Sequence, residues 1–368
     1  MANLFEPFSI GRLELRNRFV RSATWDATAN SSGAVTDDSV ALYRQLGSGG
    51  VGLIVTGFAF VSPLGQAVHH QYGVHTDDMI PGLRRLVNAA HHGGAKIALQ
   101  IAHAGIGSEY IQQIGLTALA VSRIPKLSRV HREMTNEDIE AIISDFASAA
   151  LRAVEAGFDA VQFHGAHGYL MSQFISPRFN HRTDQWGGDL GNRIRFHLDL
   201  ITRVRHTVGG HFPLMIKFGV QDDKESGLSL SEGLKAAELI VEKGIDAIEV
   251  SVGFGAAIRV MVAGDPEQAY FRDWAAAVKQ AVSVPVIAVG GIRSLEMARS
   301  IVDSGDADLV SMCRPFVREP NLIARWQRGE QGNAKCISCS KCMSSIAKGS
   351  PLVCEEEYRL IKRPNTGV

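Results

Sequence analysis

The sequence predicts an α/β protein built as a closed (β/α)8 TIM barrel, and three observations lead to this prediction. From residue 50 onwards, short runs rich in β-branched residues alternate with longer helical patterns, as in parallel βαβ units. With one run near the N-terminus, the candidate strands number eight. The 368 residues also suit one barrel of about 250 residues with insertions.

The eight predicted strands lie at residues 18–24, 52–58, 96–102, 159–165, 213–219, 247–253, 285–291 and 309–315. An open doubly wound sheet is the alternative. It usually has fewer strands and a glycine-rich first turn, and no GxGxxG follows any of the eight runs. We therefore favour the barrel.

The remaining segments have their own patterns. The early stretch "FSIGRLELRN" alternates like a small hairpin and is expected to plug the barrel floor. The segment from Ile106 to Met134 is too long for a simple connection and is predicted to be a loop over the active face. Thr135 and Asp138 form a short capping box at the start of a helix that Gly157 ends. We divide the single domain into a barrel, 1–330, and a cysteine-rich C-terminal extension packed on it, 331–368.

The composition excludes several classes of protein. Lys+Arg and Asp+Glu both number 38, so no net charge favours nucleic acid or an anionic membrane. No apolar run approaches the roughly 18 residues that span a bilayer, and the N-terminus lacks the pattern of a signal peptide. We expect a cytoplasmic, reducing location, in which the five cysteines are not disulfides.

The predicted strand ends carry small, polar and cationic residues, and the C-terminal ends of barrel strands form the working face. Lys217 ends an apolar strand, so it should face an anion or an electron-rich ligand group. Gln100 offers both a donor and an acceptor. Gly290 and Gly291 precede a helix start at Ser294, and Arg314 ends the next strand. The two glycines, the helix start and the arginine together predict a phosphate site, although a tight turn with a solvated arginine is the alternative.

The stretch "FHGAHGYL" places His164, His167 and Tyr169 after the fourth strand. A metal site would need a third ligand, and no Asp, Glu or His stands out at the neighbouring strand ends. Packed core histidines are a second interpretation. The third, which we favour, is that two neutral imidazoles donate hydrogen bonds to a substrate oxygen, each contributing about 3 kcal/mol in a transition state. Tyr169, protonated at pH 7, could then give a proton to carbon.

The C-terminal "CISCSKCMSSIAKGSPLVC" has the spacing C-x2-C-x2-C-x11-C and contains Cys336, Cys339, Cys342 and Cys354. In a cytosolic protein this spacing favours a metal over disulfides. Thiolates alone suit zinc or an iron–sulfur cluster. Four reduced thiols without a metal are the remaining interpretation.

These motifs closely resemble the Old Yellow Enzyme family of flavin-dependent ene-reductases. The resemblance covers essentially the whole barrel and is carried by "NRFVRSAT", "GLIVTGFAFVSPLGQ", "ALQIAHAG", "FHGAHGYL…SPRFNHRTDQWGGDLGNR", "VGGIRS" and "CRPF". It implies FMN across the strand ends, with the isoalloxazine ring and phosphate contacted by Ser22, Ala23, Thr24, Trp25, Gly57, Gln100, Lys217, Gly290, Gly291, Cys313 and Arg314. His164 and His167 would bind the carbonyl oxygen of an activated alkene. Tyr169 would protonate the α-carbon, reduced flavin would deliver hydride to the β-carbon, and NAD(P)H would first reduce the flavin.

Three positions depart from the family pattern. Trp25 stands where the family usually has cysteine or threonine beside the flavin, and a one-residue shift would place Thr24 there instead. Ala27 replaces an aromatic substrate contact, and Lys217 replaces a frequent arginine. These changes bear on substrate and rate more than on FMN binding.

The cysteine spacing resembles that of the dienoyl-CoA reductase and trimethylamine dehydrogenase branch, where it holds a [4Fe-4S] cluster near FMN. We hypothesise such a cluster here, fed by another protein or purely structural. We expect no FAD or NADH module in these 368 residues, and "EVSVGFGAAI" lacks the histidine of the dienoyl-CoA reductases.

The leading hypothesis is therefore an FMN-dependent oxidoreductase that uses NAD(P)H to reduce the C=C bond of enones or enals. An oxidative amine demethylase or dehydrogenase and an electron-transferring flavoprotein partner are the alternatives, whereas a metal hydrolase lacks its carboxylates. The expected partners are a small-molecule alkene and NAD(P)H or a redox protein. The apolar C-terminal arm suggests a homo-oligomer.

Overall fold

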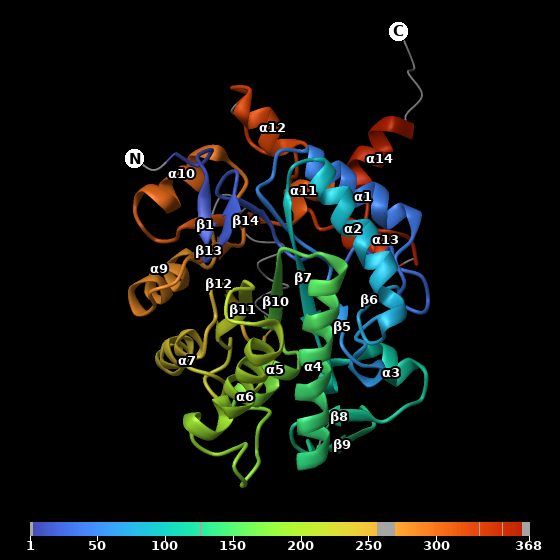
Figure 1. The fold of residues 1–368 in the computed structure, drawn as a ribbon, viewed down its shortest axis with the longest axis vertical. Helices are drawn as coiled ribbons and strands as arrows, with labels where there is room; N and C mark the ends of the chain where they lie inside the picture. The colour runs from blue at the N-terminus through green and yellow to red at the C-terminus, as the bar shows by residue number, and fades with distance from the viewer. Residues whose placement is uncertain (1–2, 126, 256–268, 331, 348, 363–368) are drawn as a thin grey trace.

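The eight predicted strands form a closed barrel. The structure is a computed structural model that describes residues 3–125, 127–255, 269–330, 332–347 and 349–362. Parallel pairing follows the order β10-β11-β12-β13-β14-β3-β4-β7, and β10 also pairs with β7, which closes the ring (Figure 1). The barrel strands are β3 (Phe19–Arg21), β4 (Leu53–Val55), β7 (Lys96–Ala102), β10 (Ala160–Gly165), β11 (Leu214–Gln221), β12 (Ala247–Val252), β13 (Val286–Val289) and β14 (Leu309–Met312). Closure confirms the TIM barrel and excludes the open sheet.

Helices follow the barrel strands along the chain and surround them (Figure 1). The main ones are α1 (Asp37–Ser48), α2 (Ile80–His92), α4 (Asn136–Ala156), α6 (Leu190–Val208), α7 (Leu230–Glu242), α9 (Arg272–Ala281), α10 (Leu295–Asp303), α11 (Arg314–Arg318) and α12 (Leu322–Gln327). The capping box of Thr135 and Asp138 is present, and Gly157 ends α4 with a left-handed backbone, both as predicted.

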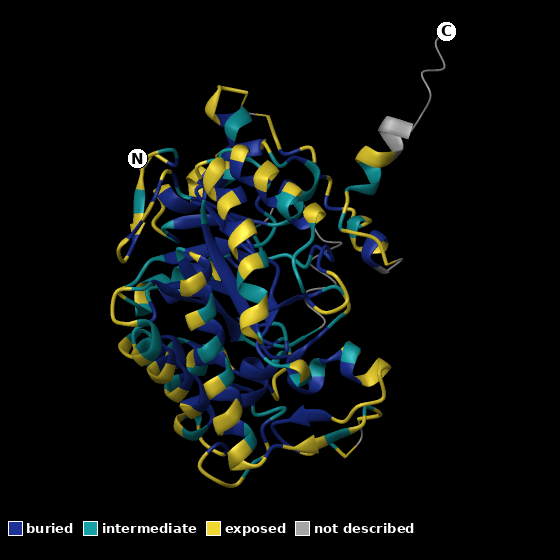
Figure 2. Ribbon diagram, turned by 45° about the vertical axis from the view of Figure 1, so that its right-hand side comes forward, coloured by how far each residue is buried: buried dark blue, intermediate teal, exposed yellow. Residues whose placement is uncertain are grey.

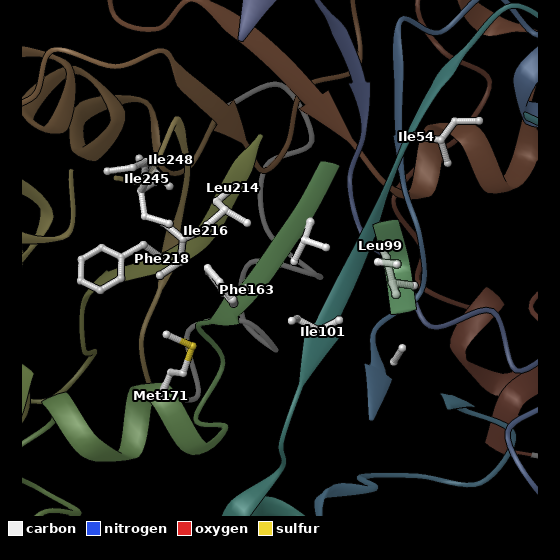
Figure 3. Close-up of a cluster of buried hydrophobic side chains, with 14 of the residues drawn as sticks. Ile54, Leu99, Ile101, Phe163, Met171, Leu214, Ile216, Phe218, Ile245 and Ile248 are labelled. Atoms are coloured by element: carbon white, nitrogen blue, oxygen red, sulfur yellow. The ribbon is translucent and has the colours of Figure 1, made fainter. Parts of the chain in front are cut away.

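The strands divide their side chains between two cores, because successive residues of a strand point to opposite faces. On β11, Leu214, Ile216 and Phe218 face the helices, where they join the large outer core (Figure 3). Met215, between them, joins a separate cluster inside the barrel. The outer core holds the helices on the barrel, and the inner positions remain available for a site.

The N-terminal hairpin closes the bottom of the barrel. Its strands, β1 (Phe8–Ile10) and β2 (Leu13–Leu15), pair antiparallel. Ile10, Leu13 and Leu15 are buried against inward-facing residues near the strand starts, such as Leu53 and Met215. The predicted floor plug is confirmed, and only the opposite end of the barrel is left to receive a ligand.

The segment from Ile106 to Met134 contains more regular structure than the predicted loop. It forms the helix α3 (Glu109–Gln113) and a small parallel pair, β8 (Ala118–Ala120) with β9 (His131–Glu133). Two further short strands, β5 (Ala59–Phe60) and β6 (Tyr72–Gly73), extend the sheet beside β7. These short elements lack the long apolar runs that identified the barrel strands.

The C-terminal extension contains α13 (Cys342–Ala347) and α14 (Glu355–Lys362), and α14 projects away from the barrel (Figure 2). Hydrogen bonds join the extension to the barrel, including Ala334 N to Arg293 O (2.7 Å) and Leu352 N to Asp26 O (2.8 Å). Residues 331, 348 and 363–368 of this predicted unit lie outside the described residues, so the boundary at 330 stays a prediction. No helix in the described ranges is long and apolar enough to cross a membrane.

Candidate active site

A layer of buried polar side chains lies inside the barrel above the apolar floor. Gln100 Nε2 donates to Gln162 Oε1 (2.7 Å), and Gln162 Nε2 donates to Glu249 Oε2 (3.0 Å). Ser22 Oγ donates to Glu249 Oε1 (2.6 Å), and Lys217 Nζ donates to Ser22 Oγ (2.8 Å). The layer therefore joins Ser22, Gln100 and Lys217, which the sequence predicted, through Gln162 and Glu249, which it did not.

Lys217 and Glu249 form an ion pair with Nζ 3.2 Å from Oε1, and both side chains are almost fully buried. Burial by itself would raise the pKa of the Glu249 carboxyl, but the charge of Lys217 and the hydrogen bonds from Ser22 and Gln162 lower it overall. The expectation that a ligand must balance the charge of Lys217 was therefore wrong. The protein supplies the anion, although the ammonium group can still direct a hydrogen bond upward.

Glu249 was missed because it lies within an apolar strand and not at its end. The signal was nonetheless in the sequence. In "AIEVSVG" Glu249 alternates with Ala247 and Ser251, and in "DAVQFHG" Gln162 stands two residues before His164. Residues two apart share one face of a strand. The prediction considered carboxylates only at the strand ends, so it overlooked one within a strand.

His164, His167 and Tyr169 come together in one group above this layer. The ring centroids of His164 and His167 are 5.1 Å apart, and those of His164 and Tyr169 are 5.0 Å apart, each pair edge to face. Phe58 packs against both His164 and Tyr169, at 5.8 and 5.4 Å. Three side chains predicted to share a substrate therefore lie within reach of one small molecule.

His167 is held in an unusual backbone conformation. Its φ is 62°, in the left-handed region that residues other than glycine rarely adopt. Its backbone N–H donates to Val252 O (3.1 Å), and its Nε2 lies 2.9 Å from Ser251 Oγ. Such strain is concentrated at functional sites, where the surrounding contacts hold it in place.

Both histidines are neutral at physiological pH. Burial, followed by the charges of His167 and Lys217, holds the pKa of His164 well below its usual value. Burial and Lys217 lower the pKa of His167 to about 3, against a raising effect of Glu249. Burial and the charge of Glu109 raise the pKa of Tyr169 to about 12, so its phenol keeps its proton. The group can donate hydrogen bonds and one proton without carrying a charge.

One ring nitrogen of this group has no protein partner. His164 Nδ1 is buried and, within the described residues, makes no hydrogen bond. A buried polar atom normally has a partner, so this nitrogen is available to a bound molecule.

The first predicted cofactor segment follows β3. That strand ends at Arg21, so Thr24 lies beyond the strand and not at its end as predicted. Ala23, Thr24 and Trp25 are half-buried beside the inner polar layer. A side chain at Gly57 would begin 3.0 Å from Thr24 O, so glycine lets the two predicted cofactor segments lie against each other.

Trp25 packs on the apolar cluster that contains Phe58 and that also contacts Tyr169. Its indole Nε1 is buried without a partner in the described part of the chain. Trp25 is thus adjacent to the histidine–tyrosine group, and its predicted place beside the flavin stays a prediction.

The predicted phosphate residues line one small cavity of about 70 Å³, which contains Gly290, Gly291, Cys313 and Arg314. Both glycines have positive φ, 100° and 74°. We predicted that Arg314 ends the last barrel strand. Instead β14 ends at Met312 and Arg314 begins α11, because Pro315 favours the first turn of a helix. Its guanidinium donates to Tyr270 Oη (2.9 Å) and Ser338 O (3.2 Å). Ser338, in the cysteine-rich extension, also lines the cavity.

The donor set of the barrel fits FMN. The cavity at Gly290 and Arg314 offers a cationic fork and glycine backbone for a phosphate. Lys217 and Gln100 lie inside the barrel, on the inward face of their strands. A cation and an amide near a phosphate site suit a flat heterocycle that carries one phosphate.

All four cysteines of the C-terminal motif line one further cavity of about 20 Å³. Burial and the neighbouring thiols raise the pKa of Cys342 to about 11. Ser338 and Ser340, on either side of Cys339, have positive φ of 56° and 57°. Among the described residues, however, no three or more His, Cys, Asp or Glu side chains are arranged to hold a metal ion. The thiols are gathered around one space, but a metal centre is not shown.

Comparison with known proteins agrees with this geometry. Residues 3–333 match the NADH:flavin oxidoreductase / NADH oxidase family. The chain is 37% identical over 343 residues to an NADH oxidase from Thermoanaerobacter brockii, which covers 92% of this chain and 53% of the relative. The chain thus spans about half the length of that protein. It is 30% identical to a 4,4'-dithiodibutanoate disulfide reductase from Rhodococcus erythropolis, over 99% of this chain and 98% of the relative.

Among solved structures, an Old Yellow Enzyme homologue from Zymomonas mobilis has the same fold, with a TM-score of 0.78 and 24% identity over 92% of this chain and 96% of that one. The family match over nearly the whole barrel and the full-length relative lead to one conclusion: the chain belongs to the NADH:flavin oxidoreductase / NADH oxidase family, the family of Old Yellow Enzyme.

Proposed function

We propose that this protein is an FMN-dependent oxidoreductase that uses NAD(P)H to reduce the C=C bond of activated alkenes such as enones and enals. The observation that carries the proposal is the group of His164, His167 and Tyr169, in which two neutral imidazoles adjoin one protonated phenol. An oxygen atom that gains negative charge and a carbon that needs a proton are the chemical features that such a group recognises.

FMN would be held by the segment from Ser22 to Trp25, by Gly57, Gln100 and Lys217, and by the phosphate cavity with Gly290, Gly291, Cys313 and Arg314. When bound, it supplies the hydride that reduces the alkene. The polar layer below fixes the position of Lys217, because Glu249 and Ser22 hold its ammonium group.

The two histidines bind and orient the substrate. Since both are neutral, each ring has one N–H, and the carbonyl oxygen of an enone accepts from them as it gains negative charge. Ser251 fixes the ring of His167, and Phe58 packs edge to face on His164. The apolar cluster around Phe58 excludes water from the same region.

Tyr169 holds the proton that the α-carbon receives. With a pKa of about 12, the phenol remains protonated across the physiological range. Tyr169 is the residue that precedes α5 (Leu170–Ile175), and its ring packs against Phe58 and edge to face on His164.

We further propose that the four C-terminal thiolates hold a [4Fe-4S] cluster, supported by their spacing and by the single cavity that they line. Changing Cys339 to Ala should lower the iron content of protein purified without oxygen to below one atom per chain, while Cys313→Ala should leave iron unchanged. Equal iron in the Cys339 variant and the parent protein would refute the cluster. A cytoplasmic location, a redox-protein partner and pairing of two chains stay predictions.

The absorption spectrum of anaerobic protein tests the function. We expect flavin bands that NADH or NADPH bleaches and that 2-cyclohexen-1-one then restores. Bleaching by a methylamine without any nicotinamide would instead favour the oxidative amine demethylase. Bleaching by nicotinamide that only an electron carrier reverses would favour the electron-transferring partner.

A further inference from the structure

Another cavity, of about 310 Å³, lies next to the histidine–tyrosine group. Trp25 and Val68 form part of its wall, and the same two side chains pack on the apolar cluster around Phe58 that Tyr169 also contacts. The cavity is bounded elsewhere by α3 and by Ile346 and Gly349 of the C-terminal extension. Because Trp25 and Val68 belong to both, a substrate whose reacting end lies at Tyr169 has this cavity beside it.

The charge in this cavity comes from one carboxylate. Glu109, the first residue of α3, lines it, and within the described ranges no lysine or arginine lines it or pairs with Glu109. His69, His70 and Gln113 are the other polar side chains that line it. A carboxylate in the wall attracts a cation and repels an anion.

Aromatic rings accompany the carboxylate. Trp25 and Tyr110 both line the cavity, and the ring of Tyr110 is held edge to face by His69 at 4.9 Å. His69 Nε2 is in turn 2.8 Å from Gln113 Oε1, so the wall is built from interlocked side chains. A carboxylate with two aromatic rings is the combination that binds ammonium and alkylammonium groups.

The carboxylate of this cavity also has an electrostatic effect on the reaction site. Glu109 is exposed, and its charge adds to the effect of burial in raising the pKa of Tyr169. A tail bound at Glu109 and a reacting group at Tyr169 can thus belong to one small molecule.

We propose that this cavity, with Glu109, Trp25 and Tyr110, binds a cationic amine or alkylammonium substituent of the substrate and so sets substrate specificity. The inference rests on the proposed function, because it assumes that the reacting end is held by His164 and His167. It adds the substrate class, namely activated alkenes that carry a positive charge away from the double bond.

Three matched phenols test the proposal in the FMN-loaded protein, since a phenol oxygen can take the place of the substrate oxygen at the histidines. They are 4-(2-aminoethyl)phenol, 4-ethylphenol and 3-(4-hydroxyphenyl)propionate, with cationic, neutral and anionic tails. Each is titrated while the flavin absorption is followed. We expect the cationic phenol to bind about threefold to tenfold more tightly than the neutral one, and the anionic phenol more weakly.

Glu109→Gln should remove the preference for the cation, and Glu140→Gln, an exposed change on α4, should keep it. The preference is the ratio of the affinities of one variant for the cationic and the neutral phenol, so a general loss of affinity does not affect it. Equal affinity for the cationic and neutral phenols, or a preference that survives Glu109→Gln, would overturn this inference and leave the histidine site standing. If no phenol altered the flavin spectrum, the proposed function itself would fail, and the inference with it.

Discussion

Lys217 and Glu249 are the residues on which the interior of the barrel depends most. Each is almost completely buried, and each charge is balanced by the other. Glu249 also accepts hydrogen bonds from Ser22 and Gln162, and Lys217 donates one to Ser22. Removing one charge of such a pair leaves the other without compensation, which usually destabilises more than removing both.

Glu249→Gln should therefore lower the free energy of unfolding by about 3–5 kcal/mol, measured by urea denaturation. The double variant Lys217→Met/Glu249→Gln should lose less than Glu249→Gln alone. An exposed pair provides the control, since Glu238→Gln, which breaks only the contact with Lys235, should change stability by less than about 1 kcal/mol. If the losses of unfolding free energy from the two substitutions simply added in the double variant, the buried charges would not depend on each other.

His197 gives a second test at the scale of one residue. It is fully buried on α6, contacts Phe196 and Phe218 edge to face, and neither ring nitrogen has a partner in the described part of the chain. Burial lowers the pKa of its imidazole to about 3. Above pH 6.5 the ring is neutral in both the folded and the unfolded chain. Below it, the unfolded chain binds a proton that the folded chain does not, so stability falls as pH falls towards 3.

We predict that His197→Leu reduces this acid sensitivity. Between pH 7 and pH 5 the variant should lose about 2 kcal/mol less unfolding free energy than the parent protein does, as measured by urea titrations at both pH values. Using the difference between two pH values cancels any change in packing. An identical loss in both proteins would show that His197 is protonated in the folded chain.

At the scale of single elements, the sequence predicts which segments form strands better than it predicts the residues at which those strands end. The runs of Val, Ile and Leu identify all eight barrel strands, because burial on both faces leaves few alternatives. β3 and β14 nevertheless end earlier than predicted, at Arg21 and Met312, because those boundaries depend on neighbours in the barrel and on Pro315. Arg314 consequently begins a helix, where its side chain contacts both Tyr270 and the cysteine-rich extension.

This position makes Arg314 a test of the phosphate site. Arg314→Met should weaken FMN binding by about tenfold to one hundredfold, because a charge-assisted hydrogen bond to phosphate is lost. Arg328→Met, on the exposed surface after α12, is the matched control and should leave the FMN dissociation constant unchanged. Fluorescence of released FMN during dialysis measures both. An unchanged affinity in Arg314→Met would place the phosphate elsewhere.

At the scale of the whole molecule, barrel closure explains which parts of the site could be predicted. His164, His167 and Tyr169 lie close together in the sequence, so their grouping could be predicted from one motif. The polar layer joins Ser22 to Glu249, which are 227 residues apart, and its members meet because β7, β10, β11, β12 and the end of β3 belong to one closed ring of strands. The four cysteines were recognised by spacing, but what they bind depends on sulfur geometry that spacing does not determine.

The central claim is that the barrel reduces an alkene with hydride from bound flavin and a proton from Tyr169. The most direct measurement is anaerobic stopped-flow absorption of Tyr169→Phe beside the parent protein, recorded in two separate steps. Reduction of the flavin by NADPH or NADH should proceed at similar rates in both, because Tyr169 takes no part in that step. Reoxidation by 2-cyclohexen-1-one should be slower in the variant by about 10²- to 10⁴-fold, the usual contribution of a general acid. Equal rates of reoxidation, or equal losses in both steps, would contradict the assignment of Tyr169 as the proton donor.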